Sequence, residues 1–441
     1  MSKKDTLIKG TFILTITGFL SRFIGFFYRI FLSRTFGEEG MGLYQLVFPV
    51  FSLGFSLSAA GIEVALSRLS AQKLSLKKNA EAKQCLFTAL LISLTISTML
   101  MLLIQKYSFE IAEYVLLDGR CQDLLIVLSY IFPFCAVHSC ICGYYLGQKK
   151  TKRIAISQLI EQIVRVLSVY IICSLLLKQN RNIPVSVTVL GLVIGETVSA
   201  FYCFVTFQKS EMNFQPTCKS TIYIWGRSKE LLMLSIPLTA NRVLLNVLQS
   251  IETISIPACL VLSGLTESEA LSLYGVLTGM AMPCIFFPSA LTGSIATMLL
   301  PTIAEMQAQQ EARNVQQLIK KVASCVFFFG CLCTAMFFLF GNFIGVFLFH
   351  SHAVGSFIMI LAWICPFMYV NTTLISMLNG LGKTTASFSI NTCGVCLRIG
   401  SVFFLIPKFG ILGYLWGLLA SQILISILAF LQLHRIHKQF H

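Results

Sequence analysis

The feature that most limits the fold is a series of apolar blocks of about 20 residues or more, separated by charged residues. About 20 apolar residues is the length that a helix needs to cross the hydrocarbon core of a bilayer. Only 12% of the residues are charged, whereas a soluble protein carries about a quarter. The alternation over about ten residues that marks a transmembrane β-barrel is absent. The sequence therefore predicts an all-α integral membrane protein.

The apolar blocks predict about twelve spans along the chain. Their cores are residues 10–35, 43–67, 84–104, 123–147, 155–177, 184–207, 230–260, 271–303, 321–348, 354–379, 385–407 and 411–433. The first block lacks the short apolar region and the small-residue cleavage site of a secretory signal, so it is interpreted as an uncleaved span.

The basic residues set an orientation for these spans. If the N-terminus is cytoplasmic and the spans alternate, most of the 33 lysines and arginines lie in cytoplasmic segments. The outer loops then contain only Arg34, Lys106, Arg120, Lys178, Arg181 and Lys408. The positive-inside rule describes this asymmetry, so both termini are expected in the cytoplasm. The net charge of +15 follows from this topology, and no nucleic-acid partner is expected.

Two segments of the first half recur in the second. LYQLVFPVF in the second span has the same outline as LYGVLTGMAMP in the eighth, and LGQKKTKRIAISQLIEQIVRVLSV parallels NGLGKTTASFSINTCGVCLRIGSV. Six is an even number, so two halves of six spans enter the membrane from the same side. We expect two six-helix lobes, residues 1–207 and 230–441, related by a parallel pseudo-twofold axis. Residues 208–229 form the expected cytoplasmic linker.

Nine ionisable side chains fall inside the predicted spans, where a central charge costs about 3 kcal/mol even on the mildest scale. They are Arg22, Arg29, Arg165, Arg242, Arg398, Glu63, Glu161, Glu196 and Glu252. Glu161 and Arg165 are four residues apart, so they are expected to form a structural ion pair on one helix. Arg398 either extends to the interface or pairs with another helix.

The arginines of the first and seventh spans have no such local explanation. Arg22 and Arg29 are two helical turns apart on one face, and no acid in that span can neutralise them. Arg242 has a similar place in the seventh span, after Pro237, which can break a helix. Guanidinium groups bind phosphate through paired hydrogen bonds, so these arginines predict a cavity for an anionic phosphate or pyrophosphate. The alternative is ion pairing with acids of other spans, namely Glu63, Glu196 and Glu252.

The 16 cysteines lie mostly within the spans, and none forms a loop pair with metal-ligand spacing. They are interpreted as small residues of helix packing. The six histidines show no ligand spacing with acids of the spans, so no metal site, cofactor or catalytic residue is expected. A membrane-embedded glycan enzyme is the alternative from another class. The three aspartates form no Asp-x-Asp motif, which argues against it.

The opening KGTFILTITGFLSRFIGFFYRIFLSRTFGEEGMGLYQLVFPVFSLGFSLSAAGIEVALSRL resembles the stage V sporulation protein B family. This is a polysaccharide-biosynthesis branch of the multidrug/oligosaccharidyl-lipid/polysaccharide exporter superfamily, which also contains the lipid II flippases. The resemblance implies a MATE-like fold and an alternating-access exporter in the bacterial cytoplasmic membrane. It would flip an undecaprenyl-pyrophosphate-linked saccharide, lipid II or a related precursor, in spore cortex synthesis. The implied substrate site is Arg22, Arg29, Arg68 and Arg242, with Arg68 resting on the resemblance alone.

The sequence leaves several alternatives open. Many relatives have two further C-terminal spans, assigned to a lipid-tail groove, whereas this chain ends at His441 after the twelfth predicted span. A multidrug efflux antiporter of the same superfamily would use Glu63 and Glu252, with Glu196 as a further candidate, to couple to sodium or protons. The excess of arginine over glutamate in the spans argues against it.

The expected partners are a lipid-linked saccharide and membrane lipids. The coupling ion and the oligomeric state stay open, and a monomer is compatible with the sequence.

Overall fold

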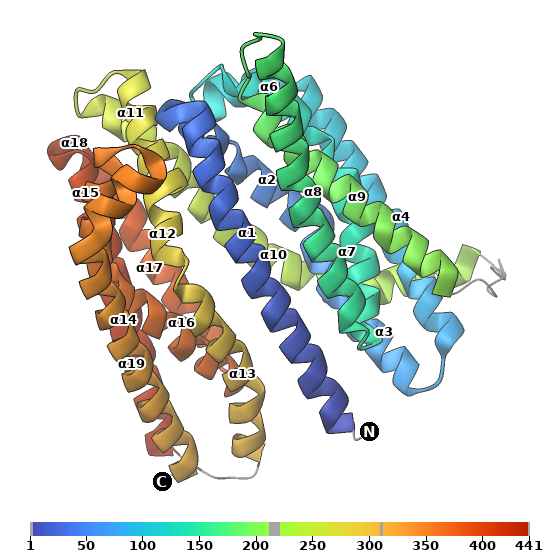
Figure 1. Cartoon of the computed structure of the whole chain (residues 1–441). Helices are drawn as coiled ribbons and strands as arrows, with labels where there is room; N and C mark the ends of the chain where they lie inside the picture. The colour runs from blue at the N-terminus through green and yellow to red at the C-terminus, as the bar shows by residue number, and fades with distance from the viewer. Residues whose placement is uncertain (1–2, 211–220, 309–311, 440–441) are drawn as a thin grey trace. The chain divides into compact units, whose positions relative to one another are not determined.

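The structure is a computed structural model that describes residues 3–210, 221–308 and 312–439 (Figure 1). Every regular element in these ranges is a helix, so the predicted all-α class is confirmed. Ten helical segments of the described residues are long and apolar enough to cross a membrane. An eleventh candidate is the bent pair α6 (Cys121–Ser129) and α7 (Ile131–Gly147).

The first of the ten segments, Phe12–Ser75, is 64 residues long. At a rise of about 1.5 Å per residue it is more than twice as long as the hydrocarbon core is thick. It is interrupted at Gly37, whose φ of 70° and ψ of −171° lie outside the helical region. The first two predicted spans, 10–35 and 43–67, lie on either side of this break. If this segment is counted as two crossings and the bent pair as one, the described helices supply as many crossings as the twelve predicted spans.

Contacts between helices divide the chain into two compact units. Unit 1 contains the residues up to Gly25 and the range Leu46–Ser250. Unit 2 contains Phe26–Gln45 and all residues from Ile251 onward. Each unit is described below by itself.

Two long helices, α1 (Lys3–Leu46) and α10 (Thr221–Leu262), contribute residues to both units. α10 continues through Pro237, so this proline does not break the helix as the sequence suggested. A proline removes one hydrogen bond of the helical ladder, which the neighbouring turns of a long span can compensate. Residues 211–220 of the predicted linker, 208–229, lie outside the described residues. The predicted boundaries of the two six-helix lobes stay a prediction.

Unit 1 is held together by helices that approach each other at small residues. Its other elements are α2 (Phe48–Phe55), the π-helical η1 (Ser56–Ala60), α3 (Gly61–Ser75), α4 (Asn79–Lys106), α5 (Ser108–Glu110), η2 (Ile111–Val115), α6, α7, α8 (Thr151–Lys178) and α9 (Ser186–Ser210). A Cβ on Gly143 would lie 2.7 Å from the backbone oxygen of Glu63, and one on Gly147 would lie 2.8 Å from that of Ser67. These glycines of α7 allow it to contact the backbone of α3 directly. α7 also packs against α4 and α9 (Figure 1).

Unit 2 is a second bundle with its own core. Its elements are α11 (Glu267–Tyr274), the π-helical η3 (Gly275–Ala281), α12 (Met282–Phe286), α13 (Ser289–Ala308), α14 (Ala312–Phe349), α15 (His352–Leu361), the 3-10 turn η4 (Ala362–Ile364), α16 (Cys365–Gly380), α17 (Thr384–Phe404), α18 (Ile406–Phe409) and α19 (Ile411–Gln439). α16 packs against α13, α14 and α19. The buried Tyr369 of α16 donates a hydrogen bond to the carbonyl of Ile285 at 2.8 Å. This bond satisfies a hydroxyl that would otherwise be buried without a partner.

The two units repeat one helix–turn–helix pattern, as the internal repeat of the sequence indicates. α7 and α16 both end at a glycine, and a lysine stands at the N-cap position of the helix that follows each of them. His138 and Asn371 stand the same number of residues before that glycine, and Arg165 and Arg398 the same number after it. Each unit therefore has a buried polar residue on the first helix and an arginine on the second.

Candidate functional site

Three of the four predicted substrate-binding arginines lie in unit 1 with exposed side chains. They are Arg22 on α1, Arg68 on α3 and Arg242 on α10. Within the described part of the chain, no acidic side chain forms an ion pair with any of them. Their positive charge is therefore not cancelled at close range.

Arg29, the fourth predicted arginine, belongs to unit 2 and is half-buried. Its Nη1 atom donates to the backbone oxygen of Thr278 at 3.4 Å. Thr278 lies in η3, where π-helical hydrogen bonding changes the direction of the backbone carbonyls. This contact holds the Arg29 side chain against η3.

Two of the acids within the spans of unit 1 are engaged by neighbouring bases. Arg165 of α8 donates to Glu161 one helical turn earlier. Glu196 of α9 is buried, and its Oε1 lies 2.8 Å from Nδ1 of His138 on α7. Neither carboxylate forms an ion pair with Arg22, Arg68 or Arg242 in the described residues.

Glu252 of unit 2 is similarly engaged. The residue is buried, and its Oε1 accepts hydrogen bonds from Nε of Arg398 at 2.7 Å and from the hydroxyl of Tyr414 at 2.9 Å. Of the two sequence alternatives for Arg398, the structure shows pairing with another helix. A buried carboxylate with two donors is a stable arrangement, whereas the same carboxylate without them would be costly.

Glu63 is the fourth acid within the spans and has no close ion pair among the described residues. It is half-buried on α3, where its backbone faces Gly143 of α7. It interacts electrostatically with His138, Arg242 and Glu196. The charges of Arg242 on α10 and His138 on α7 therefore both act on the Glu63 carboxyl group.

His138 is the residue that sequence reasoning missed. Besides its contact with Glu196, its Nε2 atom lies 3.1 Å from the hydroxyl oxygens of both Ser157 and Ser199. The expectation that no spans bring a histidine and an acid together is therefore wrong. The partners come from α8 and α9, the two helices that follow α7, so the distances between these side chains depend on how the helices pack and cannot be counted along the chain. The only sequence signal is polar residues that recur every three or four positions on α8 and α9.

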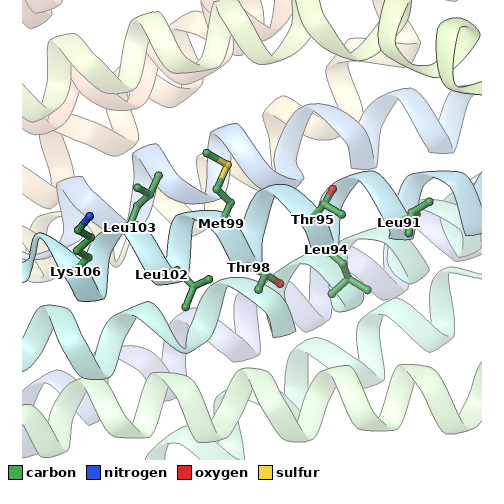
Figure 2. Close-up of a pocket in the computed structure, with 8 residues that line it drawn as sticks. All are labelled: Leu91, Leu94, Thr95, Thr98, Met99, Leu102, Leu103 and Lys106. Carbon is green, nitrogen blue, oxygen red and sulfur yellow. The ribbon is translucent and has the colours of Figure 1, made fainter.

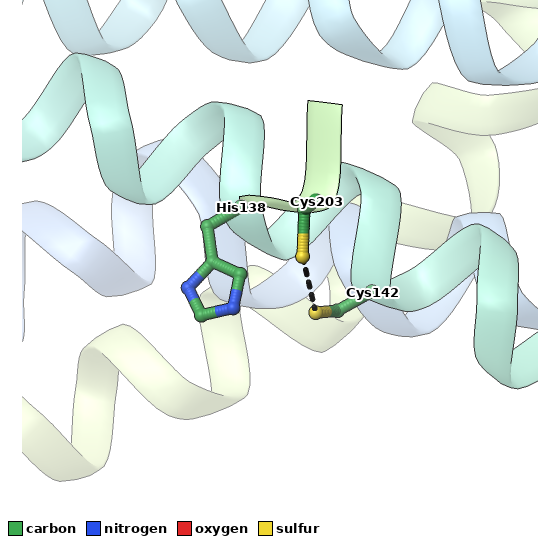
Figure 3. Close-up of side chains that lie close together, drawn as sticks. All are labelled: His138, Cys142 and Cys203. Atoms are coloured by element: carbon green, nitrogen blue, oxygen red, sulfur yellow. Dashed lines mark hydrogen bonds between the residues drawn. The ribbon is translucent and has the colours of Figure 1, made fainter. Parts of the chain in front are cut away.

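Two thiols complete this polar cluster. The donor atoms of His138, Cys142 and Cys203 all lie within 4.8 Å of one another, and all three residues are buried (Figure 3). A second group that meets the same criterion consists of His138, Glu161 and Glu196. Metal-ligand chemistry was not expected from the sequence, because the residues of each group are spread over at least two helices.

The apolar surface of each unit is grooved. On unit 1, Leu91, Met99 and Leu102 line a shallow groove along α4, with Lys106 at one end (Figure 2). On unit 2, Trp363 and Trp416 line a groove formed by α14, α15, η4 and α19. Apolar grooves on membrane-spanning helices can accommodate the hydrocarbon chains of lipids.

Comparison with known proteins assigns the chain to a family. The family model described as polysaccharide biosynthesis protein matches residues 7–307. The chain belongs to this family. A curated relative is stage V sporulation protein B of Bacillus subtilis strain 168, which is 28% identical over 432 residues, or 96% of this chain and 83% of the relative. The predicted resemblance to the polysaccharide biosynthesis family is thus confirmed.

Solved structures with the same fold include two membrane transporters. An inward-facing multidrug resistance MATE family transporter matches with a TM-score of 0.74 at 12% identity, over 98% of both chains. Lipid II flippase MurJ, in an inward closed conformation, matches with a TM-score of 0.72 at 15% identity, over 96% of this chain and 87% of that chain. These matches confirm the predicted MATE-like fold of this family member.

Proposed function

We propose that the chain is a membrane exporter that flips an anionic, lipid-linked saccharide by alternating access. The substrate we favour is a polyprenyl-pyrophosphate-linked precursor such as lipid II. The cytoplasmic membrane of a bacterium, with both termini inside, is the proposed location. In this proposal the chain is a transporter and performs no covalent chemistry.

The observation that carries the proposal is that three acids within the spans pair with bases of the protein, whereas two arginines within the spans have no acidic partner in the described part of the chain. Glu161, Glu196 and Glu252 each have a basic partner within the protein. Arg22 and Arg242 are exposed and have no acidic partner within 4 Å among the described residues. A charge in contact with hydrocarbon is costly, so an exposed arginine in a span is expected to face water or an anionic ligand. A pyrophosphate supplies the oxygens that guanidinium groups bind in pairs.

The relatives support the same substrate class. The family is named for polysaccharide biosynthesis, and a protein of the same fold is named as a lipid II flippase. We infer that Arg22, Arg68 and Arg242 of unit 1 bind the pyrophosphate, and the assignment of Arg29 stays a prediction from the sequence. The saccharide would move through the protein, while the polyprenyl tail remains in the bilayer.

The decisive experiment is a flipping assay in proteoliposomes with fluorescently labelled lipid II. Each charge-assisted hydrogen bond contributes about 1.5–3 kcal/mol, so Arg22→Ala or Arg242→Ala is expected to lower the transport rate about tenfold to a hundredfold. Arg242→Lys should recover part of this loss, because lysine keeps the charge without the paired geometry. Arg435→Ala, which removes an exposed arginine near the end of α19, is the matched control and should transport normally. Normal transport by the double variant Arg22→Ala/Arg242→Ala would rule out the proposed arginine site.

The runner-up is a multidrug efflux antiporter, favoured by the fold shared with a MATE family transporter. Such a pump needs an acid in the spans that can bind and release a cation. Glu63 is the candidate, because Glu196 and Glu252 are already engaged by His138 and Arg398. Transport of cationic dyes without any lipid-linked saccharide, lost in Glu63→Gln, would favour this function over the flippase.

A further inference from the structure

We propose that His138, Cys142 and Cys203 form a zinc site inside unit 1. The ligands would be Nε2 of the histidine and the Sγ atoms of the two cysteines. This site is separate from the arginines, and its test does not depend on the transport activity.

The ligand atoms are already close to coordination distances. The two Sγ atoms are 4.0 Å apart, and all three donor atoms lie within 4.8 Å of one another. With Zn–S bonds of about 2.3 Å and tetrahedral angles, two thiolates on one zinc ion are about 3.8 Å apart. Figure 3 shows the three side chains converging from α7 and α9. Small side-chain rotations would therefore complete the site without movement of the helices.

The hydrogen bonds around His138 leave one of its nitrogens suited to a metal. Nδ1 faces the carboxylate of Glu196, which can only accept, so Nδ1 carries the proton and donates. The two hydroxyl groups near Nε2 each donate to a backbone carbonyl. Ser157 donates to the carbonyl of Ile154 at 2.8 Å, and Ser199 donates to the carbonyl of Ser157 at 3.0 Å. In the neutral imidazole, the Nε2 lone pair thus competes with these two carbonyls for the hydroxyl protons, and the thiols are the other donors close to it. A thiol is a weak donor, so this lone pair is poorly satisfied without a metal.

The carboxylate partner of His138 matches the surroundings of known metal-binding histidines. A histidine that ligates a metal through one nitrogen usually donates the other N–H to a carboxylate, backbone carbonyl or water, which fixes the ring orientation. Glu196 is in this position and is itself buried. The alternative is a protonated His138 that donates Nε2–H to Ser157 or Ser199. That state pairs with Glu196 as well, but it leaves the two thiols without a role.

Charge balance selects the metal ion. Binding releases one proton from each thiol, and the two thiolates then neutralise a divalent cation. A neutral unit suits the interior of a helical bundle, where an uncompensated charge is costly. Thiolate and imidazole ligands select zinc or monovalent copper over magnesium and calcium, and two thiolates with Cu⁺ would leave a net negative charge. Ser157, whose hydroxyl oxygen lies 3.7 Å from Cys142 Sγ, is a candidate for a fourth position. The zinc ion would link α7 to α9.

The test is metal analysis of the full-length protein, purified in detergent under reducing conditions and incubated with zinc chloride. We expect about one zinc ion per chain after desalting. Cys142→Ser, Cys203→Ser and His138→Gln should each lower the bound zinc at least tenfold. Cys173→Ser is the matched control, because Cys173 is buried on α8 in the same unit but outside the cluster. It should bind as much zinc as the unmodified protein.

A second measurement does not depend on how well the variants fold. Cobalt(II) added to the unmodified protein should give thiolate-to-cobalt charge-transfer absorption, which zinc should then displace. Zinc retention by the Cys142→Ser/Cys203→Ser double variant, or absence of the cobalt signal, would overturn the proposal. A Cys142–Cys203 disulfide in protein purified from membranes without reductant would also overturn it, because the two thiols would then act as a redox pair.

Discussion

Glu252 shows at the scale of single residues how the fold accommodates a charge inside an apolar helix. Arg398 and Tyr414, both distant in sequence, donate to the same carboxylate oxygen. Sequence reasoning found the ion pair of Glu161 with Arg165, because four residues is the spacing of neighbours on a helix. It could not assign Arg398 to Glu252, since these residues are 146 positions apart. That assignment depends on how α10 and α17 are rotated about their axes.

Removing only one partner of this buried pair should be severely destabilising. Arg398→Met leaves the carboxylate of Glu252 buried with a single donor, and we expect a loss of about 3–5 kcal/mol in the free energy of unfolding. Denaturant unfolding of the protein in detergent, monitored by circular dichroism, measures this loss. The double variant Arg398→Met/Glu252→Gln should recover most of the stability, since the amide oxygen of glutamine still accepts from Tyr414. A double variant less stable than Arg398→Met would contradict this interpretation.

The glycines of α7 act at the scale of whole elements. They set how closely α7 packs against α3, at the level of Glu63 and Ser67. The sequence contains the small residues, but small residues at this spacing are ordinary in membrane helices and do not identify the partner helix. The partner is decided by the bundle as a whole.

An added methyl group should distinguish packed glycines from unpacked ones. Gly143→Ala places a Cβ 2.7 Å from the backbone oxygen of Glu63, and we expect a loss of about 1–3 kcal/mol in stability from overpacking. Gly400→Ala on α17 meets nothing within 4 Å and is the matched control. It should be neutral or stabilising by up to about 1 kcal/mol, because alanine favours the helix. Equal melting temperatures of the two variants would show that α3 and α7 are not in backbone contact.

At the scale of the whole molecule, the charge asymmetry makes a prediction about orientation. Both termini and the turn between α7 and α8 are expected in the cytoplasm, and the turn before α6 outside. Alkaline phosphatase fused after Asp118 should be active in cells, and the same enzyme fused after Lys149 should be inactive. Green fluorescent protein fused to the C-terminus should fluoresce. The opposite pattern of activities would reverse the predicted topology and with it the direction of transport.

The sequence by itself determined the helical membrane class, the family and the positions of most spans. These properties are sums over neighbouring residues, since hydrophobicity over about 20 positions decides whether a segment crosses the membrane. It also singled out Arg22 and Arg242 as bases without a local partner. Only the tertiary structure decided that Glu252 pairs with Arg398, and that His138 meets Glu196 and two cysteines. Those meetings depend on which faces of separate helices turn toward each other, and many different pairings have the same hydrophobic pattern.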